Sequence, residues 1–370
     1  MFMPPIEVPV RASEASELAD LIFEFAETRR LTEDLRNRLH GRIGSLKFET
    51  IVAHTGSLCA DPVHPSAFYI AVDGIRDGVS KPWLLRVADA NTPSSALFPK
   101  AILIGRMRLQ NRREIVASVV PFGAGDEVHI RTFAEEVDRA FLPRPQGTSP
   151  SIAAYANDQP FAEFRHIHKS GGLNWAATWG SRDAAMWAAI RAGWREGYSV
   201  ESEPLPLEAN EVCESAILLE PGYTKFVMEA GPLADDVAAC AEAIGGLCDF
   251  IQKARSPQPS WRRFDLEVSL ARAAVPTSAA MIGALLDELK QQGRMVQSVA
   301  PRLGGESIEV LNAAIKRHGA VFKIEVDAST PLDLLREMGA VTGGRAQCRV
   351  QRGGDMRSIA DALAGLKWRD

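Results

Sequence analysis

The feature that most constrains this chain is the repeated alternation of strand and helix patterns after residue 147. Short strand-like segments and amphipathic helical segments follow one another eight times in about 220 residues. Regular alternation of this kind implies a parallel sheet with crossover helices, and eight repeats predict a closed (β/α)8 (TIM) barrel. An open doubly wound sheet is the alternative. The expected strands are 151–155, 173–178, 198–203, 225–229, 264–269, 296–300, 322–327 and 346–350.

The first part of the chain has a different order of predicted helices and strands. A helical pattern over 12–40 precedes a series of strand patterns that are separated by Asp-Gly and Asn-Thr-Pro turn signals. A further helix is expected over 126–140, followed by a proline-rich connector. We therefore predict two domains, an α+β domain with a mainly antiparallel sheet at 1–147 and the barrel at 148–370.

Composition excludes several classes of function. The net charge of −5 argues against a general nucleic-acid binder, because such a protein needs a basic surface. The longest apolar runs are too short to cross a bilayer, and the N-terminal residues do not resemble a secretory signal. Five widely spaced cysteines favour buried thiols in a reducing compartment. These patterns predict a cytoplasmic protein without nucleic-acid or membrane partners, and they leave homo-oligomerisation open.

The strand predicted at 264–269 is polar on one face. Phe264, Leu266 and Val268 alternate with Asp265 and Glu267, so a helix that covers the apolar face leaves the carboxylates pointing into the barrel. Buried charges of this kind have to be paired or functional. The alternating charges of 225–229, 322–327 and 346–351 extend the pattern. Internal salt bridges are one interpretation, and a ligand site at the C-terminal strand ends is the other.

Four segments of the barrel region resemble the tagaturonate epimerase family, whose members are metal-dependent barrel enzymes that invert one carbon of a keto-uronate. The segments are Trp187 to Ser199, Pro221-Gly-Tyr-Thr-Lys-Phe226, Phe264-Asp-Leu-Glu-Val-Ser269 with Pro276-Thr-Ser278, and Leu289 to Arg302. The likeness covers roughly 150–365 and does not extend to the N-terminal region. It implies the same barrel fold and a small anionic carbohydrate ligand.

The sequence differs from the family at the positions where the family carries its metal ligands. Val200-Glu-Ser-Glu stands where the family carries Ala-Asp-Ala-Asp-His, and Ala271-Arg272-Ala273 replaces Asp-Glu-Thr. No histidine lies at a predicted strand end. No cofactor is therefore predicted, although carboxylates alone could hold a hard ion such as Mg²⁺. Arg272, Arg302 and Arg349 instead suggest a cationic pocket for a carboxylate or phosphate group.

Two hypotheses follow. The chain is either a non-catalytic relative that acts as a binding or partner subunit, or an isomerase or lyase of sugar acids with altered chemistry. For the enzyme we predict Glu267 and Glu229 as catalytic residues. The predicted substrate-binding residues are Arg302, Arg349, Asp327, Glu203, Arg272 and Lys323. A third and weaker interpretation is a metal site in the N-terminal domain that uses His54 and His64.

Overall fold

The computed structural model describes residues 51–76, 79–108, 114–123, 125–155, 174–178, 182–220, 222–257, 263–327, 329–350, 358–359 and 362. The chain divides into two compact units. The first comprises Met1–Leu142 with Met186–Glu196, and the second comprises Pro143–Ala185 with Gly197–Asp370. The predicted division into domains at 1–147 and 148–370 stays a prediction. The helix predicted over 12–40 lies outside the described residues.

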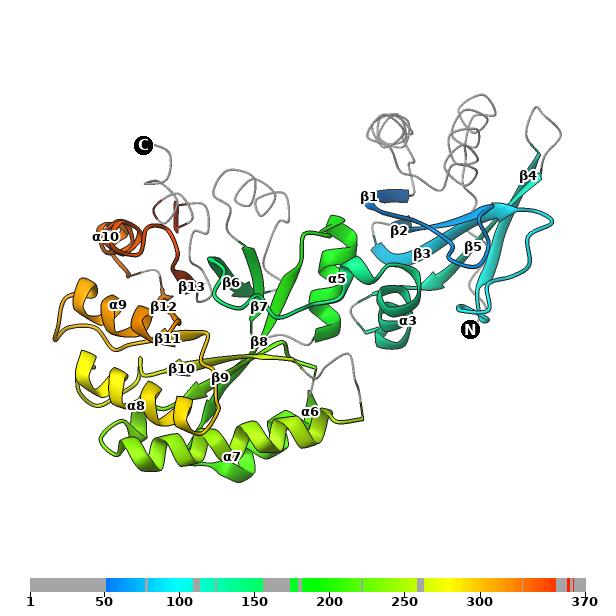
Figure 1. Cartoon of the computed structure of the whole chain (residues 1–370). Coiled ribbons are helices and arrows are strands. Elements are labelled where there is room, and N and C mark those ends of the chain that lie inside the picture. Colours follow the sequence, from blue (N-terminus) through cyan, green and yellow to red (C-terminus); the bar gives the residue numbers. More distant parts are fainter. Residues whose placement is uncertain are drawn as a thin grey trace. The chain divides into compact units, whose positions relative to one another are not determined.

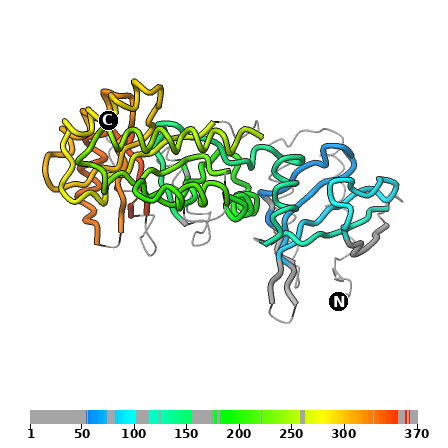
Figure 2. Tube along the Cα trace, turned by 90° about the horizontal axis from the view of Figure 1, so that it is seen from below, coloured from blue at the N-terminus to red at the C-terminus, as the bar shows by residue number. Residues whose placement is uncertain are grey.

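The first unit contains one antiparallel sheet, as the sequence predicts. The order of its five strands is β1-β2-β3-β5-β4, and the sheet runs from blue to cyan in Figures 1 and 2. β1 pairs with β2 and β2 pairs with β3, both antiparallel, so these three strands are neighbours in chain order. The strands are β1 (Ile51–Ala60), β2 (Ala67–Arg76), β3 (Val79–Asp89), β4 (Ile102–Arg108) and β5 (Glu114–Pro121).

The helix expected over 126–140 is divided into three short pieces. These are α3 (Glu127–Thr132), a π-helical turn (Phe133–Val137) and a 3-10 turn (Arg139–Phe141). The break falls at Asp138, whose backbone is extended and whose side chain accepts a hydrogen bond from the N–H of Ala140. An aspartate in this role competes with helix continuation, so the single-helix prediction is wrong at this point.

His54 is engaged within the first unit. Its Nε2 lies 2.9 Å from Asp73 Oδ2 and accepts from Arg191 Nε at 3.1 Å, while Arg191 also pairs with Asp73. Arg195 donates to Asp138 at 2.8 Å and to the carbonyl of Gly56 at 2.6 Å. A guanidinium beside His54 repels cations, so these contacts give no support to a metal site there.

The second unit is built on a closed barrel of eight parallel strands (Figure 1). The chain order of the strands is also their order around the barrel, and the ring closes where β13 pairs with β6. The predicted TIM barrel is therefore confirmed, and the open sheet is excluded. The strands are β6 (Ser151–Tyr155), β7 (Asn174–Thr178), β8 (Tyr198–Pro206), β9 (Lys225–Glu229), β10 (Asp265–Ser269), β11 (Ser298–Ala300), β12 (Val321–Val326) and β13 (Gln347–Val350).

Helices follow the strands and lie outside the ring, as Figure 1 shows. In α8, Ser278 caps the N-terminus through the N–H of Met281, and the buried side chains Ile282, Leu285 and Leu289 form one apolar face. No helix in the described ranges is long and apolar enough to cross a bilayer. The bounds of these helices are α6 (Asn210–Leu219), α7 (Val237–Arg255), α8 (Ala279–Gln291), α9 (Ile308–Arg317) and α10 (Leu332–Thr342). α5 (Arg182–Ala192) belongs to the first unit from Met186 onward.

Candidate functional site

The middle of the barrel is filled by charged side chains. Glu201 on β8, Lys225 on β9, Glu267 on β10, Lys323 on β12 and Arg349 on β13 are all buried. Alternation along each strand directs them inward, while neighbours such as Leu266 and Val268 face the helices. We call these five residues the lumen cluster.

The cluster is held by short hydrogen bonds between opposite charges. Lys323 Nζ donates to both oxygens of Glu201 at 2.7 and 2.8 Å and to Glu267 Oε2 at 2.6 Å. Arg349 Nη2 bridges Glu201 at 3.0 Å and Glu267 at 2.8 Å. Lys225 Nζ lies 2.9 Å from Glu267 Oε2. Each carboxylate in the cluster therefore faces three cations.

These contacts keep both carboxylates ionised. Burial alone would raise the pKa of Glu201, but the charges of Lys323, Lys225 and Arg349 outweigh it and lower the pKa to about 2. Burial opposes the charges at Glu267 too, and its pKa is lowered further by the same three cations. The pKa of Lys323 falls to about 8, because burial and Arg349 outweigh the carboxylates, so its ammonium is still mainly protonated at pH 7. A carboxylate held this way is a poor base.

The N-terminal end of the barrel is closed by hydrogen bonds to the segment before β6. Asp265 Oδ2 accepts from the N–H groups of Gln146 and Gly147 at 2.8 and 2.7 Å. Gln347 Nε2 donates to the carbonyls of Gly147 and Ser149, and its Oε1 accepts from Lys225 at 2.6 Å. The residues before β6 are thus fixed to the lumen cluster.

The C-terminal end of the barrel carries a different carboxyl group. Glu229 is the last residue of β9 and lies beside Ser269, the last residue of β10, in the strand register. The side chain of Glu229 accepts weakly from Ser269 Oγ and from the Gly231 N–H, both at 3.3 Å. Its ion-pair partner among the described residues is the exposed Arg272, whose Nε lies 3.8 Å from Oε2. Glu229 is therefore buried but loosely paired.

Burial sets the proton affinity of Glu229. The residue is 4% exposed, and desolvation raises its pKa more than the Gly231 N–H and Arg272 lower it. The charge of Glu325 raises the pKa of Glu229 as well. A carboxyl group with a raised pKa at a strand end suits proton transfer, because it exchanges a proton closer to neutral pH.

Gly231 allows the loop after β9 to pass close to the loop after β10. A Cβ atom at this position would lie 2.5 Å from Ala273 N and 2.6 Å from Arg272 C, which are backbone atoms that cannot swing away. The glycine therefore brings its own N–H to Glu229 and the Arg272 loop to the same edge of the barrel.

Two more polar groups lie at this end. Glu325 on β12 accepts from Arg349 Nη1 at 2.9 Å and keeps part of its side chain exposed. Thr178 ends β7, and its buried hydroxyl has no hydrogen-bond partner in the described part of the chain. Together with Glu229, Ser269 and Arg272, these residues form what we call the barrel mouth.

The predicted site residues separate into two groups. Glu267, Lys323 and Arg349 belong to the lumen cluster, where every charge is already paired. Glu229 and Arg272 lie at the barrel mouth. The side chains of the lumen cluster are at most 3% exposed and are bound to one another, and the roles predicted for these three members, as base and anion ligands, stay predictions.

Arg302 supports loops instead of facing the lumen. Its Nη1 donates to the carbonyls of Ala273 and Ala274, and its backbone N–H donates to Thr277 Oγ1. The guanidinium thus links the loop after β11 to the loop after β10. Arg302 thus orders the loop that carries Arg272, and its predicted role as a substrate ligand stays a prediction.

Glu203 and Asp327 also differ from the predicted arrangement. Glu201 pairs with Lys225 and Pro204 with Val227, so an irregularity between them turns the exposed Glu203 out of the interior. Asp327 is exposed and accepts from the hydroxyl and N–H of Ser329, which lower its pKa. Its carboxylate orders the turn after β12.

Sequence reasoning missed two residues that the geometry singles out, namely Glu201 and Thr178. A signal for Glu201 was present, since Ser199 and Glu201 alternate with the apolar Tyr198 and Val200. The alternation in 346–351 placed Gln347 on the inward face, but its hydrogen bonds to Gly147, Ser149 and Lys225 were not predicted. The interior position of Thr178 follows only from the strand register, which pairs it with Tyr155. A single sequence does not give that register.

The described residues do not fit a divalent metal site of the family type. No group of three or more His, Cys, Asp or Glu residues within them is placed to hold a metal ion. The carboxyl groups of Glu229 and Glu325 have Arg272 and Arg349 as neighbours, whose charges oppose a cation. His166 and His168 lie outside the described residues.

Comparison with solved structures supports the resemblance at the level of the fold. The chain is similar to the fructuronate-tagaturonate epimerase UxaE from Cohnella laeviribosi in a glycerol complex, with a TM-score of 0.57 and 13% identity over 85% of this chain and 74% of that chain. The native form of the same enzyme matches with a TM-score of 0.56, at 13% identity over 84% and 74%. No family model and no curated protein matches the sequence.

The structural match is wider than the sequence resemblance. Residues 148–370 make up about 60% of the chain, so a match over 85% includes part of the N-terminal region as well. The structural likeness thus extends beyond the segments in which the sequence itself shows a resemblance. At 13% identity the match establishes the fold, and the chemistry has to be argued from the residues.

Proposed function

We propose that the barrel mouth binds a small anionic sugar acid of the keto-uronate kind and moves a proton on it, with Glu229 as the acid-base group. The observation that carries this proposal is the state of Glu229, which is 4% exposed, raised in pKa by burial and loosely paired at a C-terminal strand end. Barrel enzymes carry out their chemistry at that end. An isomerase or epimerase is the class of enzyme that this group would serve.

Arg272 and Ser269 complete the binding chemistry of the proposal. The Arg272 side chain is 67% exposed, so its guanidinium is free to meet a substrate carboxylate in two-point contact. Ser269 and Thr178 offer hydroxyl groups to the hydroxyls of a sugar acid. A ligand with one carboxylate and several hydroxyl groups matches this set.

Epimerisation by proton transfer acts on a carbon next to a carbonyl group, where loss of the proton leaves a stabilised enolate, and it returns a proton to the opposite face of that carbon. It needs proton-transfer groups on two sides of the substrate. Glu229 on β9 and Glu325 on β12 are separated by two strands in a ring of eight, which brings them to different sides of the mouth. We propose Glu325 as the second group, with Arg349 as the residue that orients it.

The fold match adds support of a general kind, since the similar structure is named an epimerase of fructuronate and tagaturonate. These two keto-uronates are therefore the first substrates to test. The buried, unpaired cysteines are in keeping with a cytoplasmic setting, which we include in the proposal.

A second candidate function is that of a non-catalytic binding or partner subunit. The self-paired lumen cluster favours it, because three cations and the carboxylates facing them fill the barrel interior without any ligand. In this case the barrel mouth binds a sugar acid without proton transfer, and Glu229 only accepts hydrogen bonds from the ligand.

Proton exchange in heavy water distinguishes the two functions. Purified protein is incubated with fructuronate or tagaturonate in D₂O, and loss of the substrate C–H signal is followed by NMR. The enzyme proposal predicts exchange that falls by about 10²–10⁴ in Glu229→Gln. Glu242→Gln, on the exposed face of α7, is the matched control and should retain the wild-type rate. Binding of the uronates without exchange would support the second candidate instead.

A further inference from the structure

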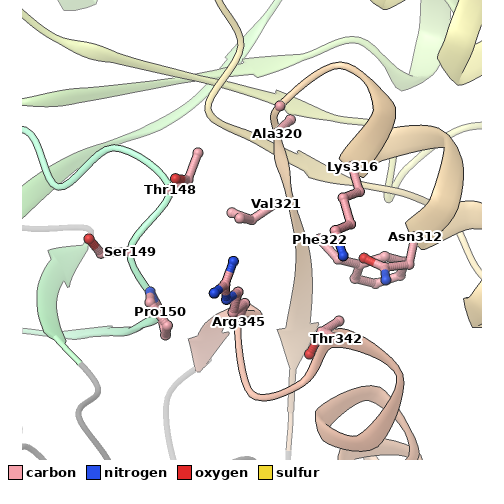
Figure 3. Close-up of a pocket in the computed structure, with 11 residues that line it drawn as sticks. Thr148, Ser149, Pro150, Asn312, Lys316, Ala320, Val321, Phe322, Thr342 and Arg345 are labelled. Carbon is pink, nitrogen blue, oxygen red and sulfur yellow. The ribbon is translucent and has the colours of Figure 1, made fainter.

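A cavity lies at the opposite end of the barrel from Glu229. Its volume is about 450 Å³, and it is formed where β12, β13 and β6 begin (Figure 3). One wall is the segment 148–150, the second is α9 with the turn into β12, and the third is the turn between α10 and β13. A volume of this size accommodates a small metabolite.

The cavity is cationic. Lys316 from α9 and Arg345 from the turn before β13 line it, and none of its lining residues is an aspartate or glutamate. Within the described part of the chain, neither side chain makes an ion pair or donates a hydrogen bond. Figure 3 shows Arg345 extending from its turn toward Val321. Two positive groups without acidic partners attract an anion into this space.

Hydroxyl and apolar groups surround the two cations. Thr148 and Ser149 contribute hydroxyl groups, and Val321 and Phe322 contribute apolar surface. The hydroxyl of Thr342, which also lines the cavity, already donates to the carbonyl of Met338 at 2.8 Å. An arginine fork, a lysine ammonium and the hydroxyls of Thr148 and Ser149 form a set suited to a phosphate, whose oxygens accept many hydrogen bonds. The apolar surface suits the carbon skeleton of a phosphate ester.

The walls are fixed before any ligand arrives. The segment 146–149 is held by the hydrogen bonds to Asp265 and Gln347 described above. Asn312 Nδ2 donates to the carbonyl of Val341 and so joins α9 to α10. Preformed walls reduce the entropy cost of binding.

From these observations we propose that this cavity is a binding site for a small phosphate ester, with Arg345 and Lys316 as its anion ligands. The site is separate from the barrel mouth and does not depend on the proposed reaction. Gln347 connects it to the interior, since this side chain contacts both the cavity wall and Lys225. A ligand here therefore stabilises the barrel from its N-terminal end.

Calorimetric titration of the full chain with ribose 5-phosphate, inorganic phosphate and ribose tests the proposal. We expect ribose 5-phosphate to bind, phosphate to bind more weakly and ribose not to bind. The double variant Lys316→Gln/Arg345→Gln should weaken the phosphate ester by about tenfold or more. Arg317→Gln is the matched control, because it removes a charge from the same helix end at an exposed residue that does not line the cavity.

Three outcomes would overturn the proposal: no binding of either phosphate compound, equal binding to the wild type and the double variant, or equal loss in Arg317→Gln. Arg272→Gln separates the two ends of the barrel. Loss of ribose 5-phosphate binding in this variant, with binding retained in Lys316→Gln/Arg345→Gln, would assign the ligand to the mouth. Circular dichroism of each variant confirms that the fold is kept.

Discussion

The lumen cluster and the barrel mouth both contain glutamates on inward-facing strand positions, yet they differ in how those charges are satisfied. Glu267 has hydrogen bonds or ion pairs with Lys225, Lys323 and Arg349, all at 2.9 Å or less. Glu229, two strand positions nearer the C-terminal end by register, has one cation at 3.8 Å. Burial acts on both, but nearby charge lowers the pKa of one, while the other stays raised.

The difference separates structural from chemical carboxylates on the same barrel. A buried carboxylate with three cations is locked in one protonation state, and removing a partner leaves charges without compensation. A buried carboxyl group with few partners keeps access to both protonation states. Counting polar residues on a strand face is therefore not sufficient to identify a site.

The largest expected effect comes from Arg349→Met in the lumen cluster. Loss of the guanidinium removes a donor that Glu201, Glu267 and Glu325 all share, and the free energy of unfolding should fall by about 3–5 kcal/mol. Urea denaturation followed by circular dichroism measures the change. Arg336→Met is the control, because its pair with Asp333 is exposed and should contribute less than about 1 kcal/mol. Equal losses in the two variants would contradict the structural role of the cluster.

The change in unfolding free energy with pH should depend on the titration of Glu201. Its folded pKa of about 2 is lower than its usual 4.5, so its contribution is complete above about pH 4.5 and is lost as the pH falls toward 2. The shift corresponds to about 3 kcal/mol. Unfolding free energies measured between pH 5 and pH 2 should therefore fall less steeply in Glu201→Gln. Parallel curves for the variant and the wild type would count against this assignment.

A smaller effect is expected at the mouth from Gly231→Ala. The added methyl group would meet the backbone of Arg272 and Ala273 and push the two loops apart, at a cost of about 1–3 kcal/mol. The N–H of Gly231 would move away from Glu229, so ligand binding or turnover should decline more than stability. Gly246→Ala on α7 is the control, since a Cβ there meets nothing within 4 Å. Full function in Gly231→Ala would show that the close approach is unimportant.

The barrel itself could be predicted from sequence because it depends on local periodicity. The predicted strand at 225–229 matches β9 residue for residue, and 264–269 differs from β10 only at Phe264. Inward-facing charge at Glu267 and Lys323 followed from the same alternation. The prediction for the first unit was less accurate at residues 126–140. There the capping side chain of Asp138 interrupts the helix although the helical periodicity of the sequence continues.

The pairing of charges could not be predicted, because it depends on contacts between distant strands. Lys323 and Glu201 form a hydrogen bond across the barrel, and no spacing in the sequence predicts that contact. An irregularity in β8 reverses the direction of Glu203, and the carbonyls of Ala273 and Ala274 engage Arg302. Each correction arises from geometry that the residue type alone does not contain.

One measurement tests the central claim most directly, namely the unfolding free energies of Glu267→Gln and Glu229→Gln compared with the wild type at pH 7 in urea. Both changes replace a buried glutamate on an inward-facing position by its neutral isostere. We expect a loss of about 3–5 kcal/mol for Glu267→Gln, where three cations lose one of the two carboxylates that they share. We expect a change within about 1 kcal/mol for Glu229→Gln, whose carboxyl group is disfavoured as an anion. Equal losses, or the larger loss in Glu229→Gln, would show that nearby charge does not distinguish the two carboxyl groups.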